Sequence, residues 1–336
     1  MPPFPDALAG ASIALGALLV LATLVDVFMT VFMIGGGAGP QSRVLADRAW
    51  RLALRVHSPR SARSHSWLRA AGPLILLLVL LAWVLELTLA WALVFVPRAF
   101  VSSGDVDFLD RLEFGAKAVI GRTGNSPALS VAGDGWESVQ ALAGLSGVTL
   151  VSVGLAYVLP ILGAVAHKRS IAATIHTLGD GVDEMRALGR TRGGSSFELH
   201  LVSLIPSISL CAERHRSYPV LHYFHSRDRH AALAPAIAKV ALLTRGDLDE
   251  ADKVDATVVM PLDRAIANLL DALCTMGLER YAEDLGRLDD GLEAIRLEPW
   301  SASSSAPVPT TGWLEAYVAF DGWSWEEIVA GDSEHG

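Results

Sequence analysis

The amino-acid sequence predicts an all-α membrane protein with three transmembrane helices, a re-entrant pore helix and loop, and a helical cytoplasmic domain. Two observations lead to this class. Hydrophobic residues make up 51% of the 336 residues, and long apolar runs gather in the first half of the chain. The net charge of −9 lies in the second half, because residues 1–166 carry 11 basic and 10 acidic side chains, whereas residues 167–336 carry 16 and 26. We therefore expect a membrane half and a soluble half.

The expected organisation has three parts. Residues 1–71 hold an N-terminal transmembrane helix and a basic cytoplasmic loop, and residues 72–167 hold a span, a short helix, a turn and a further span. Residues 168–336 hold the cytoplasmic helical domain and a C-terminal tail. Each apolar run is long enough, at about 1.5 Å per residue, to cross a hydrocarbon core of roughly 30 Å.

The first apolar run, Leu8–Ile34, follows a segment without Lys or Arg. It therefore lacks the charged region of a signal peptide, and we expect a retained helix. The next loop sets seven arginines against the single acid Asp47: Arg43, Arg48, Arg51, Arg55, Arg60, Arg63 and Arg69. The positive-inside rule places this loop in the cytoplasm and the N-terminus outside, in a multi-pass protein of the cell (inner) membrane. Arg48, Arg51 and Arg55 share one helix face, which fits an interfacial helix or a plain topology-setting loop.

The second and third apolar runs, Leu74–Val96 and Val139–Ala166, enclose a segment with the pattern of a re-entrant loop. Phe108–Ile120 is half apolar and too short to span, and a glycine-bearing turn at Ile120–Asn125 follows it. Irregular backbone at membrane depth is tolerated only where it lines a cavity or is buried in protein. This segment is also modestly acidic, which would raise the local cation concentration.

Special residues inside the spans suggest two further roles. Gly154, Pro160 and Gly163 in the third run could form a gating hinge, and ordinary helix packing is the alternative. The intramembrane acids Asp26 and Glu86 could form a proton or ion relay, because buried charge in lipid is costly. Alternatively, Asp26 lies near the cytoplasmic interface and a neighbouring helix holds Glu86 by hydrogen bonds.

The order of these elements resembles the bacterial two-transmembrane pore-loop potassium channel family, here with an extra N-terminal helix and a divergent filter. Four motifs carry the resemblance across residues 20–170: Asp26-Val27-Phe28, the turn Ile120–Asn125, Gly135-Trp136, and the small-residue face Gln140–Gly147. The stretch Tyr218–His225 also looks like one that follows such pores. In the family, backbone carbonyls of the filter replace the hydration shell of potassium, and four chains surround one pore.

The resemblance implies a filter at Ile120, Gly121, Arg122, Thr123, Gly124 and Asn125. Gly121 and Gly124 match the two filter glycines, although two residues separate them where the family has one, and Asn125 stands where the family has Asp. The threonine at the base of the filter is absent. Lys117 in the short helix and Arg122 in the turn add positive charge, which would repel a cation near a narrow axis.

The function implied by the resemblance is conduction of a monovalent cation, potassium as the permeant ion, through a homotetrameric pore in the lipid bilayer. The cytoplasmic domain would then serve assembly or gating. The alternative is a non-conducting channel homologue that acts as a membrane sensor or scaffold. Lys117, Arg122 and the stretched glycine spacing favour this alternative, whereas the acidic mouth and the third span favour conduction.

The soluble half has the periodicity of amphipathic helices. We expect them at Ile171–Leu188, Phe197–Arg216, Ala231–Leu243 and Val254–Leu278. A linker at Glu298–Pro309 leads to a tail with aromatic residues Trp313, Tyr317, Phe320, Trp323 and Trp325. We expect this tail to dock on its own domain; binding of a partner is the alternative.

Several classes of function lack support in the sequence. The acidic balance argues against a nucleic-acid partner, and no G-x-S-x-G, P-loop or H-E-x-x-H motif indicates an enzyme or a cofactor. Cys211 and Cys274 suit a reducing cytoplasm. Histidines gather at His200, His215, His222, His225 and His230. Cys211 and His215 with His222 and His225 could offer tetrahedral metal ligands, but structural hydrogen bonding and pH sensing are alternatives, and we assign no metal.

Overall fold

In the part of the chain that the structure describes, three helices are long and apolar enough to cross a membrane. They are α1 (Asp6–Phe32), α3 (Ala62–Phe95) and α5 (Trp136–His176), and their apolar windows have mean hydropathies of 2.4, 2.5 and 2.2. Large apolar side chains on them face outward, such as Leu18 and Leu145, which are 62% and 63% exposed. Since water would not favour such faces, lipid is their natural solvent. The chain is therefore an all-α membrane protein, as predicted.

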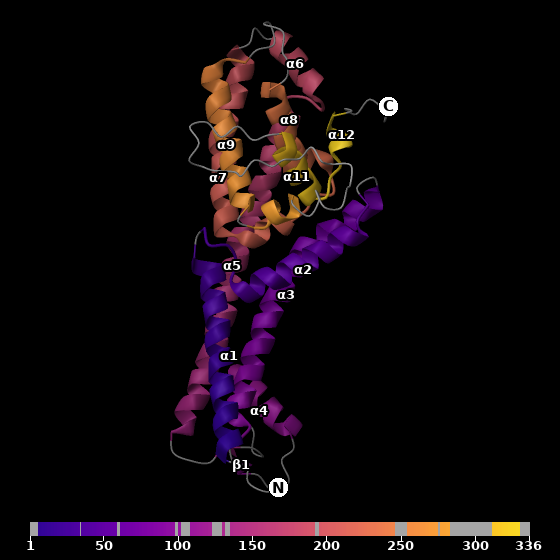
Figure 1. The fold of residues 1–336 in the computed structure, drawn as a ribbon. Coiled ribbons are helices and arrows are strands. Elements are labelled where there is room, and N and C mark those ends of the chain that lie inside the picture. The colour runs from indigo at the N-terminus through magenta and orange to yellow at the C-terminus, as the bar shows by residue number, and fades with distance from the viewer. Residues whose placement is uncertain are drawn as a thin grey trace. The chain divides into compact units, whose positions relative to one another are not determined.

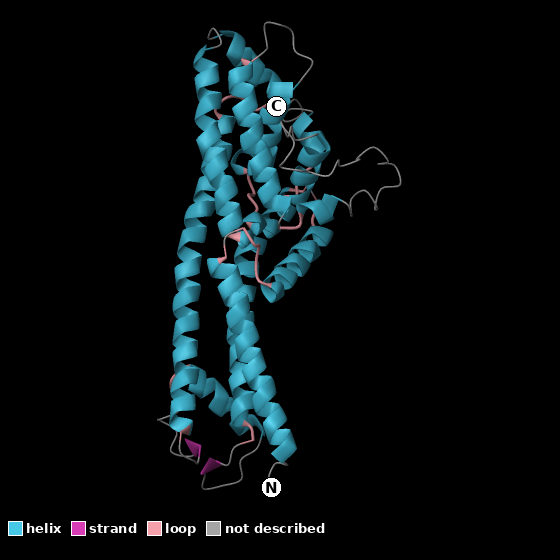
Figure 2. Cartoon of the chain, turned by 60° about the vertical axis from the view of Figure 1, so that its left-hand side comes forward, coloured by secondary structure: helices cyan, strands magenta, loops and turns pink. Residues whose placement is uncertain are grey.

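The structure, a computed structural model, describes residues 6–33, 35–58, 61–97, 100–101, 108–122, 130–131, 135–191, 195–245, 254–274, 276–282 and 311–329. Figure 2 shows how far helices dominate this part of the chain. The chain divides into two compact units. Unit 1 comprises Met1–Val31, Gly39–Ser42 and Leu77–Pro160, and unit 2 comprises Phe32–Ala38, Arg43–Leu76 and Ile161–Gly336.

Unit 1 contains α1, the part of α3 from Leu77 onward, the short helix α4 (Phe108–Val119) and the first part of α5 (Figure 1). Strands β1 (Phe100–Val101) and β2 (Ser130–Val131) form a two-residue antiparallel pair. Helices α1 and α3 approach closely at Gly16, where an added Cβ would lie 2.6 Å from the Ala90 carbonyl oxygen. Helices α3 and α5 are joined by a 2.9 Å hydrogen bond from Trp91 Nε1 to Ser146 Oγ.

Unit 2 is a helical domain. Its elements are most of α2 (Pro40–Val56), the start of α3, the end of α5, α6 (Val182–Thr191), α7 (Ser195–Ser217), η2 (Pro219–Tyr223), η3 (Arg229–Ala231), α8 (Leu233–Arg245), α9 (Ala256–Cys274), α11 (Thr311–Phe320) and α12 (Trp325–Val329). Helices α7 and α9 pack along each other, and α11 and α12 pack on α8. Their contacts bury the apolar faces that the periodicity of the sequence predicts.

The C-terminal tail docks on unit 2 as helices α11 and α12, which confirms the expected docking. Trp313, Tyr317 and Phe320 are at most 3% exposed. The tail also receives hydrogen bonds from the arginine-rich segment, since Trp50 Nε1 donates to the Phe320 carbonyl at 3.2 Å and His57 Nε2 lies 2.8 Å from the Gly322 carbonyl. These bonds explain why residues 43–76 group with the helical domain, where the sequence suggested a boundary at residue 71.

One predicted helix boundary was wrong. No separate helix begins at Ile171, because α5 continues without a break from Trp136 to His176, and Lys168 within it is buried and paired with Asp321. The chain then turns at Gly179, where Gly179-Asp180-Gly181 interrupts the periodic run; the φ of Gly179, +152°, is rarely adopted by other residues. Helix α6 begins after this turn, at Val182.

Candidate functional site

Helix α4 lies between α3 and α5 of unit 1 and is held there by close backbone contacts. An added Cβ at Gly115 would lie 2.6 Å from Ala92 Cα, and one at Gly147 would lie 1.9 Å from the Val119 carbonyl oxygen. Phe114 of α4 is 1% exposed and meets Phe95 edge to face, with 5.3 Å between ring centroids. Only glycine permits such approaches, so the small-residue face predicted at Gln140–Gly147 is the surface on which α4 packs.

The turn after α4 begins as a helix C-cap. Gly121 has a φ of +71°. Its N–H donates to the Ala118 carbonyl at 3.0 Å, and the Arg122 N–H donates to the Lys117 carbonyl at 2.8 Å. This pair of bonds is a Schellman motif, which satisfies the last carbonyl groups of the helix. The first predicted filter glycine therefore has a capping role in the chain.

The two basic residues near this turn differ in their surroundings: Lys117 forms an ion pair, and Arg122 is exposed. Lys117 Nζ lies 2.6 Å from Glu113 Oε1, one helical turn away, so the lysine is paired within α4. Ile120 is 62% exposed, and Arg122 is exposed as well. The remaining filter candidates, Thr123, Gly124 and Asn125, lie outside the described residues.

Asp26 caps the N-terminus of α2. Its carboxylate accepts hydrogen bonds from the N–H groups of Gln41 (2.8 Å) and Ser42 (3.3 Å), from the Ser42 hydroxyl, and from Trp83 Nε1 at 2.9 Å. The side chain is fully buried, and Gly39 packs so closely that an added Cβ would lie 2.4 Å from Asp26 Oδ1. A carboxylate at a helix N-terminus satisfies free N–H groups and interacts favourably with the helix dipole. The contacts thus favour a structural role for Asp26.

The two acids of the apolar runs, Asp26 and Glu86, both accept a hydrogen bond from Gln41. Gln41 donates its backbone N–H to Asp26 and its side-chain amide to Glu86 Oε1, at 3.0 Å. Glu86 is half-buried and lies one turn from Trp83 on α3. Hydrogen bonding of Glu86 to a neighbouring helix is the alternative that the sequence left open. A relay role for either acid stays a prediction.

Replacing Asp26 by Ala should lower the free energy of unfolding by about 2 kcal/mol, because several donors at the α2 N-terminus and Trp83 Nε1 lose their buried acceptor. The melting temperature of the purified protein in detergent measures this change. Glu86→Gln is the control, since it keeps an acceptor for a single, more exposed bond and should change the melting temperature little. Equal shifts in the two variants would contradict the capping role.

The hinge candidates lie within one continuous helix. Pro160, which has no N–H to donate, is the last residue of unit 1 on α5, and Ile161 begins the α5 part of unit 2. An added Cβ at Gly154 would lie 3.3 Å from Leu80 Cδ2, whereas one at Gly163 would meet no atom within 4 Å. The division of the chain at Pro160 is the feature that a hinge would require.

The histidines that the sequence suggested as possible metal ligands, His215, His222 and His225, make different contacts. His215 Nδ1 lies 2.8 Å from the Cys211 carbonyl oxygen, and His222 stacks on Phe320 with 3.8 Å between ring centroids. His225 uses both ring nitrogens: Nδ1 lies 2.8 Å from the Asp321 carbonyl oxygen, and Nε2 lies 2.9 Å from His65 Nδ1. The contacts therefore favour structural hydrogen bonding for His215 and His225, and ring stacking for His222.

Burial keeps these imidazoles neutral. Desolvation lowers the pKa of His215 to about 3, with the Lys168 charge acting in the same direction. Desolvation also lowers the pKa of His225 to about 3, although its bond to the Asp321 carbonyl opposes the shift. The pKa of His57 is lowered in the same way.

The sequence did not reveal the buried pair Lys168–Asp321. Their charged atoms lie 3.3 Å apart, and the side chains are 2% and 1% exposed. Lys168 belongs to α5 and Asp321 follows α11, so no local spacing joins them. The sequence feature that could have indicated this pair is Asp321 itself, an acidic residue within an aromatic tail that was expected to pack on its own domain.

The fold and these contacts define the class: an all-α membrane protein whose last two spanning helices hold a short helix between them, with a second, helical unit. Among curated proteins, the chain is similar to the "Uncharacterized membrane protein YdjJ" of Bacillus subtilis (strain 168), with 26% identity over 229 residues. The match covers 66% of this chain and 65% of that protein, less than two thirds of its length. No family model matches the chain, and no solved structure matches significantly. The relative supports the assignment to a membrane and nothing finer.

Proposed function

We propose that the chain forms a pore-loop channel for monovalent cations, with potassium as the permeant ion and four chains around one pore. The docking of α4 carries this proposal. A helix of 12 residues is too short to span, yet Gly115 and Gly147 seat it against two spanning helices. Such a helix, followed by a turn, is what a pore loop requires, because irregular backbone at membrane depth must be buried in protein or line a cavity.

In this proposal unit 2 lies in the cytoplasm and the N-terminus lies outside. The arginine-rich segment supports this orientation, because basic residues next to spans favour the cytoplasmic side. The pairing of Lys117 with Glu113 also supports conduction, since it reduces the positive charge of α4. Helix α5 continues from Pro160 into unit 2, which offers a direct mechanical link between the pore and a gating domain.

A second candidate is a non-conducting membrane sensor or scaffold. The Schellman cap at Gly121 and the exposed Arg122 favour it, because a filter needs its backbone carbonyls directed at ions and an arginine near the axis repels cations. The two candidates differ in a measurable property, the flux of cations.

Potassium flux through the purified protein in liposomes under an imposed gradient should exceed that of protein-free liposomes. Arg122→Ala should increase the flux, since it removes a positive charge beside the proposed pore. The control is Arg48→Ala, which removes an exposed arginine of α2 and should leave the flux unchanged. The mass of the purified complex, compared with that of one chain, checks the tetramer.

Each outcome of the flux experiment has a definite meaning. Flux in Arg122→Ala alone would identify a pore blocked by its own arginine. Absence of flux in both proteins, with melting temperatures that show folded protein, would overturn the channel and leave the sensor or scaffold.

A further inference from the structure

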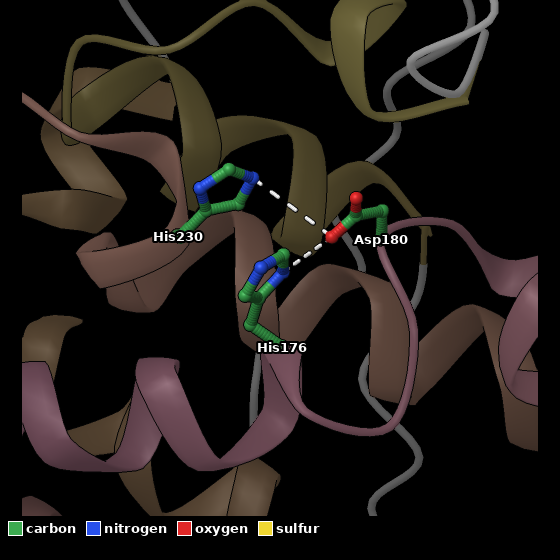
Figure 3. Close-up of side chains that lie close together, drawn as sticks. All are labelled: His176, Asp180 and His230. Carbon is green, nitrogen blue, oxygen red and sulfur yellow. Dashed lines mark ion pairs between the residues drawn. The ribbon is translucent and has the colours of Figure 1, made fainter.

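Two histidines and an aspartate of unit 2 converge at the end of α5. Figure 3 shows both imidazoles directed at one carboxylate oxygen. His176 Nδ1 lies 2.7 Å from Asp180 Oδ1, and His230 Nε2 lies 3.9 Å from the same oxygen. One potential ligand atom from each residue lies within 4.8 Å of the other two. The side chains are 30% to 44% exposed, but His176 Nδ1 itself is buried and makes no hydrogen bond among the described residues.

The backbone holds Asp180 in place. Gly179 makes the sharp turn after α5, and an added Cβ there would lie 2.8 Å from Met185 N. The Asp180 N–H donates to Glu184 Oε2 at 2.8 Å, and Lys239 Nζ donates to the Asp180 carbonyl. The carboxylate is therefore turned back towards His176 by a fixed loop.

Asp228 orients His230. His230 Nδ1 lies 3.3 Å from Asp228 Oδ1, an oxygen that also accepts the His230 backbone N–H at 3.0 Å. A carboxylate beside one ring nitrogen keeps the proton on that nitrogen, so the other nitrogen presents a lone pair. In His230 this lone pair, on Nε2, faces the negative Asp180 oxygen. Two acceptors that face each other are stabilised by a cation between them.

We propose that His176, Asp180 and His230 bind a divalent transition-metal ion of the zinc class. Two imidazole nitrogens and one carboxylate oxygen are the ligands that zinc and its first-row neighbours accept, whereas Mg²⁺ and Ca²⁺ prefer oxygen alone. Asp228 supplies the carboxylate that typically orients a metal-bound histidine. The acids Asp180, Asp228 and Glu184 add negative charge around the cation.

The proposed site leaves a coordination position for water. Three protein ligands are one fewer than tetrahedral zinc requires, and the site borders an open cavity of about 440 Å³ next to Glu184. His176 Nδ1 lies 2.7 Å from Asp180 Oδ1 but makes no hydrogen bond within the described part of the chain. A metal ion would take the lone pair of this nitrogen, and any proton on it would leave to solvent. A bound metal would connect the end of α5 to η3, two segments that are distant from each other in the sequence.

Titration of the full-length protein with Co²⁺ and with Zn²⁺ tests the site. The protein is purified in detergent through a tag without histidine and freed of metal with a chelator. Co²⁺ should give the visible absorption of a low-coordinate site at one equivalent per chain, and Zn²⁺ should displace it. His176→Asn and His230→Asn should each weaken binding by at least about tenfold.

Matched controls separate the site from the other histidines and acids. His200→Asn changes an exposed histidine of the same unit, and Asp183→Asn changes an exposed acid near Asp180, so both should bind as the native protein does. Melting temperatures without metal show whether each variant is folded, and only the native protein and the two controls should gain stability from Zn²⁺. No binding at micromolar metal, or equal binding in all folded variants, would overturn the proposal.

Discussion

Replacing Lys168 by Met should lower the free energy of unfolding of unit 2 by about 3–5 kcal/mol, because the Asp321 carboxylate is left buried without its counter-charge. The lysine ammonium group lies 3.3 Å from Asp321 Oδ1 and 3.2 Å from the Phe224 carbonyl oxygen. Both side chains are almost fully buried, so water cannot replace the lost partner. The tail that carries Asp321 should dock less tightly.

Thermal unfolding in detergent, followed by tryptophan fluorescence, measures this effect. For a domain of this size the melting temperature should fall by on the order of 10 °C. Lys168→Met combined with Asp321→Leu should recover most of the loss, because it removes both charges and keeps apolar volume. Arg186→Met breaks a pair whose acid, Asp183, is 96% exposed, and should cost less than about 1 kcal/mol. A loss in Lys168→Met no larger than that in Arg186→Met would contradict the importance of the pair.

Acid should destabilise unit 2 from about pH 6.5 downward. His215 and His225 have pKa values of about 3 in the folded protein because burial disfavours the charged imidazole. Between that value and the ordinary pKa near 6.5, the unfolded chain binds protons that the folded chain does not. Their stabilisation is therefore fully present above about pH 6.5 and is lost progressively as the pH falls, at roughly 2–3 kcal/mol per pH unit for the two together.

The neighbours of these histidines explain the direction. His225 Nδ1 donates to the Asp321 carbonyl, so its Nε2 must accept from His65 Nδ1, and a proton on Nε2 would set two donors against each other. Lys168 adds positive charge near both imidazoles. Burial also lowers the pKa of His222, whereas it raises the pKa of Asp321, which acts in the opposite direction at lower pH.

Melting temperatures measured between about pH 7.5 and about pH 5 test this prediction. His225→Gln should reduce the pH dependence by about one proton, because the glutamine amide has no proton to take up in this range. The exposed His200→Gln should leave the dependence unchanged. A melting temperature that does not vary with pH over this interval would show that the buried imidazoles are not held neutral.

The sequence alone determined the three spanning helices, because length and hydropathy are local properties of a run of residues. It also determined the position of α4 between two spans, the helical nature of the second half and the docking of its aromatic tail. Helix ends were less predictable. Helix α5 continues past His167 because Lys168 meets a partner 153 residues later, and a local pattern cannot contain that information.

The tertiary structure decided the roles of the charged residues. Asp26 caps α2, and Lys168 pairs with Asp321. His176, Asp180 and His230 form a cluster of three potential metal ligands. Each of these arrangements joins residues of different helices or of the loops between them, and the distances between these residues depend on how the helices pack. Hydrophobic periodicity shows which face of a helix is buried, because burial follows from composition. It does not show which polar group lies opposite, because that depends on the position of another helix.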